Sequence, residues 1–129
     1  MKNFSIEGMT VSKEYYATEK PAISHGMFTM KNNGDESLCL TSVQVKVLSN
    51  EEQMNVPDFY IYRLPDYNEI DRNNFQVNPQ EELTVDISFP FIFKYANPFN
   101  DIKVGLYFQI NNAEFSAFSQ VKIIIRNKG

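Results

Sequence analysis

The sequence contains one cysteine and one histidine, and both shortages exclude classes of protein. A lone cysteine, Cys39, allows no intrachain disulfide, so the fold cannot depend on a disulfide framework. A lone histidine, His25, excludes the multi-histidine centres of blue-copper proteins and of most zinc proteins. It also leaves His25 as the only base for a Ser-His-Asp or Cys-His pair. The five glycines are dispersed, and no glycine-rich loop could hold a phosphate group.

Charge and hydropathy argue against nucleic acid and membrane as partners. The net charge is −4, and the twelve Lys and Arg residues are scattered, so no basic patch could follow a phosphate backbone. The N-terminal stretch MKNFSIEGMTVSKEYY lacks the apolar core of a signal peptide. For 129 residues we expect a single domain over residues 1–129. We expect it to be cytoplasmic as written, and secreted or periplasmic if a leader precedes it.

Alternation of apolar and polar residues is the dominant pattern, and it predicts strands. It is clearest around FPFIFKYANPF, residues 89–99, where five aromatic rings would otherwise indicate a binding surface. Pro90 cannot donate to a ladder and predicts an edge position or a bend. Only the tail from Tyr95 to Phe99 is expected to be a surface feature. The residues of inward parity are Leu83, Val85, Ile87, Phe89, Phe91, Phe93 and Tyr95.

The same pattern recurs along the chain, separated by turn signals. Asn111-Asn112 predicts a hairpin turn, and a parity shift predicts a bulge near Thr41. The longest loops are expected at 49–55 and 66–74. We predict an all-β fold: a single antiparallel β-sandwich, immunoglobulin-like, with seven to eight strands. The expected strands are 4–11, 23–31, 38–48, 59–64, 75–77, 83–95, 102–110 and 115–125.

Two stretches, FTMKNNGDESL at 28–38 and VNPQEELTVDISF at 77–89, resemble bacterial immunoglobulin-like modules. They match the strand, Asn-Gly turn and strand of such modules, and the Pro-Glu lead-in to a long strand. The sequence departs from them at Gln80, where those modules often have Gly, and it has no Trp for the Cys, Trp and Cys core of antibody domains. The resemblance implies a non-catalytic interaction or adhesion domain, and it transfers no functional residue. We expect no cofactor.

The stretch DFYIYRLPDY, residues 58–67, is the best candidate for a partner-binding site. If Phe59 and Ile61 face the core, Tyr60 and Tyr62 face outward, with Arg63 at the strand end and Tyr67 in the next loop. Tyrosine and arginine are enriched in interface hot spots. The alternative is that the tyrosines only pair across strands. The predicted partner is a protein, bound through Tyr60, Tyr62, Arg63 and Tyr67 or by strand addition at an exposed edge; such an edge would also allow a homodimer.

Three other hypotheses remain. In the first, His25, Met27 and Met30 of SHGMFTM bind soft Cu(I), as a His-x-Met pair on one strand face could; the alternative is that both methionines fill the core. In the second, the acidic pair Glu51-Glu52 serves a cytosolic inhibitor or immunity-type protein that blocks an enzyme. In the third, Asp66, Glu69 and Asp71 bind calcium, although the spacing departs from an EF-hand and a solvated loop is the preferred interpretation. Cys39, between two leucines, is expected to be a buried apolar residue.

Overall fold

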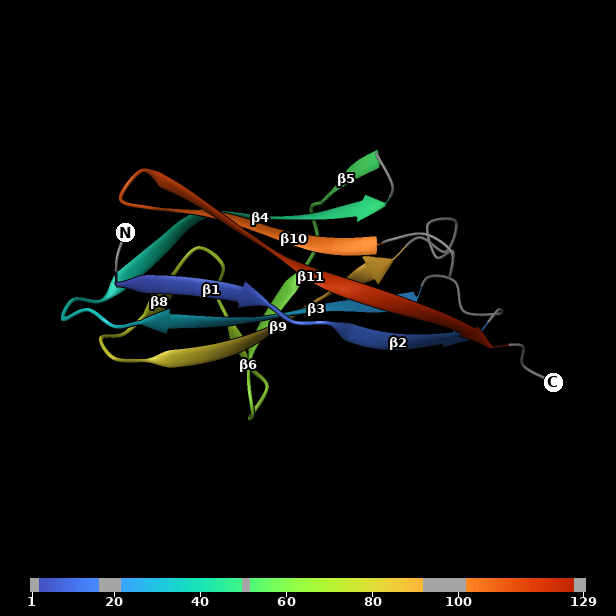
Figure 1. The fold of residues 1–129 in the computed structure, drawn as a ribbon, viewed down its shortest axis with the longest axis horizontal. Coiled ribbons are helices and arrows are strands. Elements are labelled where there is room, and N and C mark those ends of the chain that lie inside the picture. The colour runs from blue at the N-terminus through green and yellow to red at the C-terminus, as the bar shows by residue number, and fades with distance from the viewer. Residues whose placement is uncertain (1–2, 17–21, 50–51, 92–101, 127–129) are drawn as a thin grey trace.

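The computed structural model describes residues 3–16, 22–49, 52–91 and 102–126, which form eleven strands and no helix (Figure 1). The all-β prediction is therefore confirmed, but the strand number exceeds the predicted seven to eight. The strands are β1 (Phe4–Gly8), β2 (Val11–Tyr16), β3 (Ala22–Asn32), β4 (Leu38–Ser49), β5 (Glu52–Val56), β6 (Tyr60–Arg63), β7 (Asn68–Ile70), β8 (Phe75–Val77), β9 (Glu82–Phe91), β10 (Ile102–Ile110) and β11 (Ala113–Arg126).

The strands form two sheets that pack face to face as a sandwich. In the first sheet the order is β1-β3-β9-β6-β7, and every neighbouring pair is antiparallel. In the second sheet the order is β2-β11-β10-β4-β5, and here β2 lies parallel to β11. The short strand β8 pairs with the first residues of β4. This two-sheet arrangement agrees with the fold-level resemblance to immunoglobulin-like modules.

The core lies between the sheets and contains the side chains of one parity from each long strand. In β9 the inward residues Leu83, Val85, Ile87 and Phe89 are at most 2% exposed, as their alternation predicts. Each such side chain stabilises the fold by roughly 1.5–3 kcal/mol through burial. The largest buried side chains come from both sheets: Phe28, Phe75, Phe89, Met30, Leu40, Ile61, Ile87, Ile102, Leu106 and Ile110.

Only part of the aromatic stretch at 89–99 is described. Phe89 is buried, which confirms its predicted inward direction, whereas the side chain of Phe91 and residues 92–99 lie outside the described residues. Pro90 is exposed and is in register with Ile23 of β3, while the pairing of β9 with β6 stops at Ser88. Pro90 thus sits where β9 has a described neighbour on one side, which suits a residue without an N–H.

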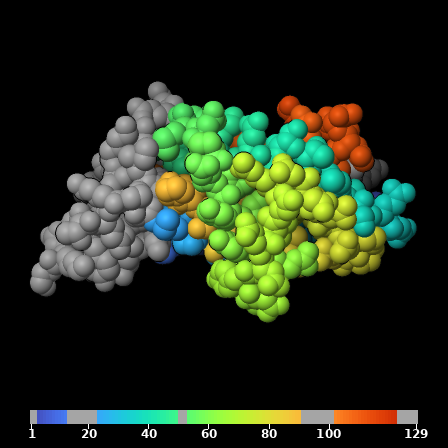
Figure 2. Space-filling model, turned by 180° about the vertical axis from the view of Figure 1, so that it is seen from behind, coloured from blue at the N-terminus to red at the C-terminus, as the bar shows by residue number. Residues whose placement is uncertain are grey.

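Three of the strands were not predicted. The expected single strand at 4–11 is divided, because the chain leaves the first sheet after Gly8 and enters the second sheet at Val11. The expected loops at 49–55 and 66–74 instead contain β5 and β7, each paired with the preceding strand. In Figure 2 the green to yellow segment from β5 to β8 covers much of the face shown.

The turns at 32–35 and 111–112 have different roles. Asn111 and Asn112 have positive φ angles of 51° and 66° and join β10 to β11 as the predicted hairpin. The turn after Asn32, in contrast, carries the chain across to the second sheet, so the return strand β4 pairs with β10 rather than with β3. The predicted bulge in β4 is confirmed, because its register with β10 shifts near Ser42, whose φ is 54°.

Candidate functional site

Two of the candidate sites lie on the same surface, the outer face of the first sheet. The strands β3, β9 and β6 are neighbours there, and their inward parity is occupied by core residues. The registers then align residues that are far apart in the sequence. One row contains His25, Ser88 and Tyr60, and the next row contains Met27, Asp86 and Tyr62. The copper hypothesis and the partner-binding hypothesis therefore concern adjacent parts of one face.

Tyr60, Tyr62 and Tyr67 form a continuous group of rings, which we call the tyrosine surface. The rings of Tyr60 and Tyr62 are stacked at 6.3 Å between centroids, and Tyr67 lies 6.5 Å from Tyr62. Tyr60 is 53% exposed and Tyr67 is 59% exposed, while Phe59 and Ile61 are buried. The predicted direction of each residue in this strand is thus observed. Tyr67 adopts a positive φ of 57°, which the sequence did not predict.

Arg63 is the last residue of β6, at the strand end where it was predicted. It has the parity of Ile61 rather than that of the tyrosines, and its Nη1 donates to Oε2 of Glu81 at 2.9 Å. Its side chain is 40% exposed, so the ion pair contributes little to stability. In this arrangement the guanidinium contacts Glu81 through Nη1.

A hollow of about 500 Å³ adjoins Tyr60 between the β5–β6 connection and β7. Arg72 lines this hollow. Its guanidinium lies 4.7 Å from the centroid of the Phe59 ring, and its Nη1 donates to the carbonyl of Pro57. The acidic residues that line the hollow are Asp58, Glu69 and Asp71. Since Arg72 is the one basic residue in the lining and is held by these contacts, the hollow favours a positively charged group.

His25 and Asp86 form a partly buried polar pair on this face. His25 Nδ1 lies 3.2 Å from Oδ1 of Asp86, which is 6% exposed although it stands on the outer side of the sheet. Ser88 is directly opposite His25 in the register. The pair resembles the orienting half of a catalytic triad, but no hydrogen bond joins Ser88 to His25 in the part of the chain that the structure describes.

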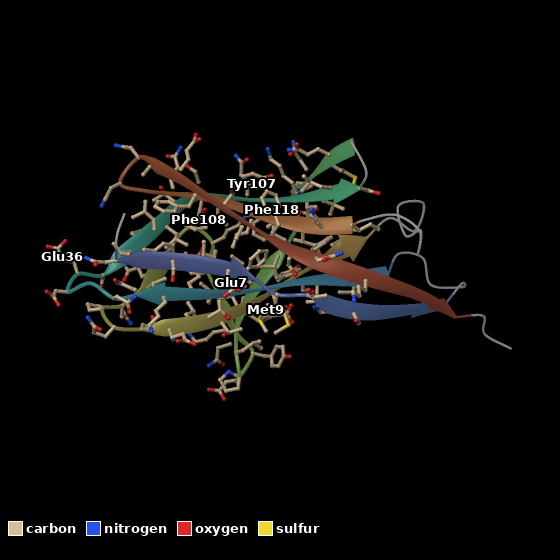
Figure 3. The ribbon with its side chains drawn as sticks, viewed as in Figure 1. Glu7, Met9, Glu36, Tyr107, Phe108 and Phe118 are labelled. Carbon is tan, nitrogen blue, oxygen red and sulfur yellow. The ribbon has the colours of Figure 1, made fainter. Side chains whose placement is uncertain are left out.

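The proposed copper ligands are only partly brought together. His25 and Met27 share the outer face, whereas Met30 is fully buried in the core on the inner face and cannot join them. A different methionine, Met9, lies next to Met27 instead. Its N–H donates to the carbonyl of Met27, and its sulfur accepts a long hydrogen bond from Thr29 at 3.8 Å. In Figure 3 Met9 lies where β1 passes into β2.

The remaining candidates are placed as follows. Asp71 accepts a hydrogen bond from the N–H of Asn73 at 2.8 Å, which is a local turn, and the described residues contain no group of three His, Cys, Asp or Glu that could hold a metal ion.

Cys39 is exposed, so its predicted burial is wrong. Its neighbours of inward parity are Leu38 and Leu40, and Cys39 must point the other way. Glu51 lies outside the described residues, and Glu52 is the first residue of β5.

Two residues of this face, Met9 and Asp86, were missed in the sequence. Asp86 is the one charged residue in the alternating run LTVDISF, and a lone charge between buried positions could have drawn attention. Met9 carried no such signal, because its position opposite Met27 depends on the pairing of β1 with β3.

The comparisons with known proteins support the fold. No family model and no curated protein matches the chain. Among solved structures, it is similar to the sporulation control protein Spo0M from Bacillus subtilis (12% identity, TM-score 0.52, 94% of this chain, 49% of that one). It is also similar to a family 123 glycoside hydrolase from Clostridium perfringens (5% identity, TM-score 0.58, 96% of this chain, 28% of that one). An uncharacterized β-sandwich protein from Clostridium difficile matches with 13% identity and a TM-score of 0.48, over 89% of this chain and 78% of that one.

The similarities to Spo0M and to the glycoside hydrolase show a shared fold and nothing finer. The chain spans about half the length of the Spo0M chain and about a quarter of the glycoside hydrolase. A sporulation control protein and a glycoside hydrolase both occur among the similar structures, so the fold alone does not decide between catalysis and binding. In the described ranges, no helix has the length and hydropathy of a membrane span.

Proposed function

We propose that this chain is a non-catalytic module that binds a partner protein through the tyrosine surface. The observation that carries the proposal is the contact of three tyrosine rings on a sheet face where two of them are more than half exposed. Tyrosine rings supply rigid, amphipathic area that loses little conformational entropy on binding, which is why they are enriched among interface hot spots.

The charge around the tyrosine surface indicates a basic partner. Asp58, Glu69 and Asp71 line the adjoining hollow, and Asp86 is paired in register with Tyr62. Arg63 and Arg72 are held by contacts within the chain, to Glu81 and to Pro57 and Phe59. A Lys or Arg side chain of a partner would therefore meet carboxylates in the hollow and the face of a tyrosine ring beside it.

The same face supports a non-catalytic role. His25 is the only histidine of the chain, and its Nδ1 contacts Asp86. A triad also needs a nucleophile hydrogen-bonded to the histidine, and Ser88 makes no such bond in the described part of the chain. The arrangement supports recognition rather than acyl transfer.

Capture of a partner by the purified domain, followed by binding measurements with matched variants, tests the proposal. A Tyr60→Ala, Tyr67→Ala double variant should lose the partner, because both side chains are exposed and their removal leaves the core intact. Phe118→Ala is the control, since Phe118 is 42% exposed on the outer face of the second sheet. Retention of the partner by the tyrosine variant, or equal loss in the Phe118 control, would contradict the proposal. Size-exclusion chromatography of the domain alone shows whether the partner is a second copy of this chain.

A further inference from the structure

We propose that the outer face of the first sheet binds one Cu(I) ion through Nε2 of His25 and the sulfur atoms of Met27 and Met9. This inference is independent of the tyrosine surface, because none of its ligands is a tyrosine. It replaces the ligand set His25, Met27 and Met30, which the burial of Met30 excludes.

The first argument is the placement of the two methionines. In the antiparallel register of β1 and β3, Gly8 lies opposite Phe28. Continuing this register by one residue on each strand places Met9 opposite Met27. The hydrogen bond from the Met9 N–H to the Met27 carbonyl, at 2.9 Å, shows that the pairing does extend this far. Side chains directly opposite in an antiparallel pair have Cβ atoms roughly 4.5–5.5 Å apart and share a face. The contact of the Met9 sulfur with Thr29 places that sulfur on the outer face.

The second argument is the orientation of the histidine. A carboxylate only accepts hydrogen bonds, so His25 in its neutral form carries the hydrogen on Nδ1, toward Asp86, and the lone pair on Nε2. Among the described residues Nε2 has no hydrogen-bond partner. Asp86 therefore acts as the positioning residue that metal-binding histidines usually have, since a carboxylate at one ring nitrogen sets the tautomer and the orientation of the ring.

The third argument is the exposure of the side chains. Met9 is 42% exposed and Met27 is half-buried, on a face whose other residues are largely polar. Methionine normally fills gaps in cores, as Met30 does here. His25 and Met27 are two residues apart in one strand, so their side chains point the same way and start roughly 7 Å apart. Thioether and imidazole ligands together select a soft ion, and Cu(I) is the one that this set favours.

The test uses Cu(I) under anaerobic conditions, in competition with the chromophoric chelator bicinchoninate. All variants carry Cys39→Ser, because the exposed thiol of Cys39 would itself bind Cu(I). We expect one equivalent of Cu(I), with affinity lowered about tenfold or more by Met9→Leu, by Met27→Leu and by His25→Asn. Leucine conserves the volume of methionine, so the fold is retained. The control is Met54→Leu, which removes a sulfur from β5 of the other sheet and should leave the affinity unchanged.

A second measurement locates the ion. In protein labelled with ¹³C at the methionine methyl groups, titration with Ag(I), a redox-inert substitute for Cu(I), should move the signals of Met9 and Met27 and leave those of Met30 and Met54 in place. Absence of Cu(I) uptake would overturn the proposal. So would unchanged affinity in the Met9 and Met27 variants, or movement of the Met30 or Met54 signals instead. The Tyr60→Ala, Tyr67→Ala variant should bind Cu(I) normally, which separates this site from the partner-binding proposal.

Discussion

Gly8 lies with its α-carbon against the backbone carbonyl of Phe118, at the point where the chain leaves the first sheet for the second. Next to this contact, the Ser119 hydroxyl donates to the carbonyl of Met9 at 2.6 Å and accepts from the N–H of Met27 at 3.2 Å. Ser119, a buried residue of β11, thus links the end of β1 to β3. The close approach of Gly8 to β11 accompanies this link, because a side chain at Gly8 would separate the two sheets.

Gly8→Ala should destabilise the protein by about 2–3 kcal/mol, because the new Cβ would overlap backbone atoms of Phe118 that cannot move aside. The matched control is Gly34→Ala, where the nearest atoms are a side-chain oxygen at 3.3 Å and a side-chain carbon at 3.4 Å. That variant should stay within about 1 kcal/mol of the parent. Urea unfolding of the three proteins measures both effects. Equal stability of the two variants would show that the sheets separate easily at this point.

Truncation of two neighbouring residues of β6 should reduce stability by very different amounts. Ile61 is 1% exposed and Tyr60 is 53% exposed. Ile61→Ala should cost about 2–5 kcal/mol through lost burial and a cavity, whereas Tyr60→Ala should cost less than about 1 kcal/mol. Thermal or urea unfolding provides the comparison. If Tyr60→Ala were the more destabilising change, the assignment of faces in this strand would be wrong, and the partner-binding proposal would lose its basis.

The alternation of residues predicted which side chains are buried, and it did so well within single strands. The inward residues of β9 and the shift of parity in β4 are both observed, because a buried face constrains every second residue. Alternation contains no information about which strand lies next to which. The sequence therefore predicts the turn after Asn32 but not that β4 beyond it pairs with β10 of the second sheet.

The candidate site was predictable to the same extent. The outward direction of Tyr60 and Tyr62 follows from their own strand, and the structure confirms it. The pairing of Arg63 with Glu81, and the position of Asp86 between His25 and Tyr62, depend on registers between segments distant in the sequence. A local pattern could not supply these contacts, so two separate candidate sites were expected where one face exists.

Cys39 should react quickly with a thiol reagent such as DTNB in the native protein. It is exposed on β4, whereas its neighbour Leu40 is 1% exposed. Accessibility governs the rate when a thiol has no structural protection. The measurement compares the DTNB reaction rate in buffer with the rate in urea. An exposed cysteine should react at a similar rate under both conditions. A reaction that begins only on unfolding would restore the burial expected from the flanking leucines.

Gln80 should show how a turn balances backbone strain against side-chain hydrogen bonds. Its φ is 63°, a conformation that favours glycine, yet its Nε2 donates to the carbonyls of Asn33 and Gly34 at 3.0 Å each. Gln80→Ala loses both hydrogen bonds and keeps the strain, and should cost about 1–2 kcal/mol. Gln80→Gly loses the same bonds but relieves the strain, and should be more stable than the alanine variant by about 1 kcal/mol. Urea unfolding of the three proteins tests this order. An alanine variant as stable as the parent would mean that the two bonds to the Asn33-Gly34 turn contribute nothing to stability.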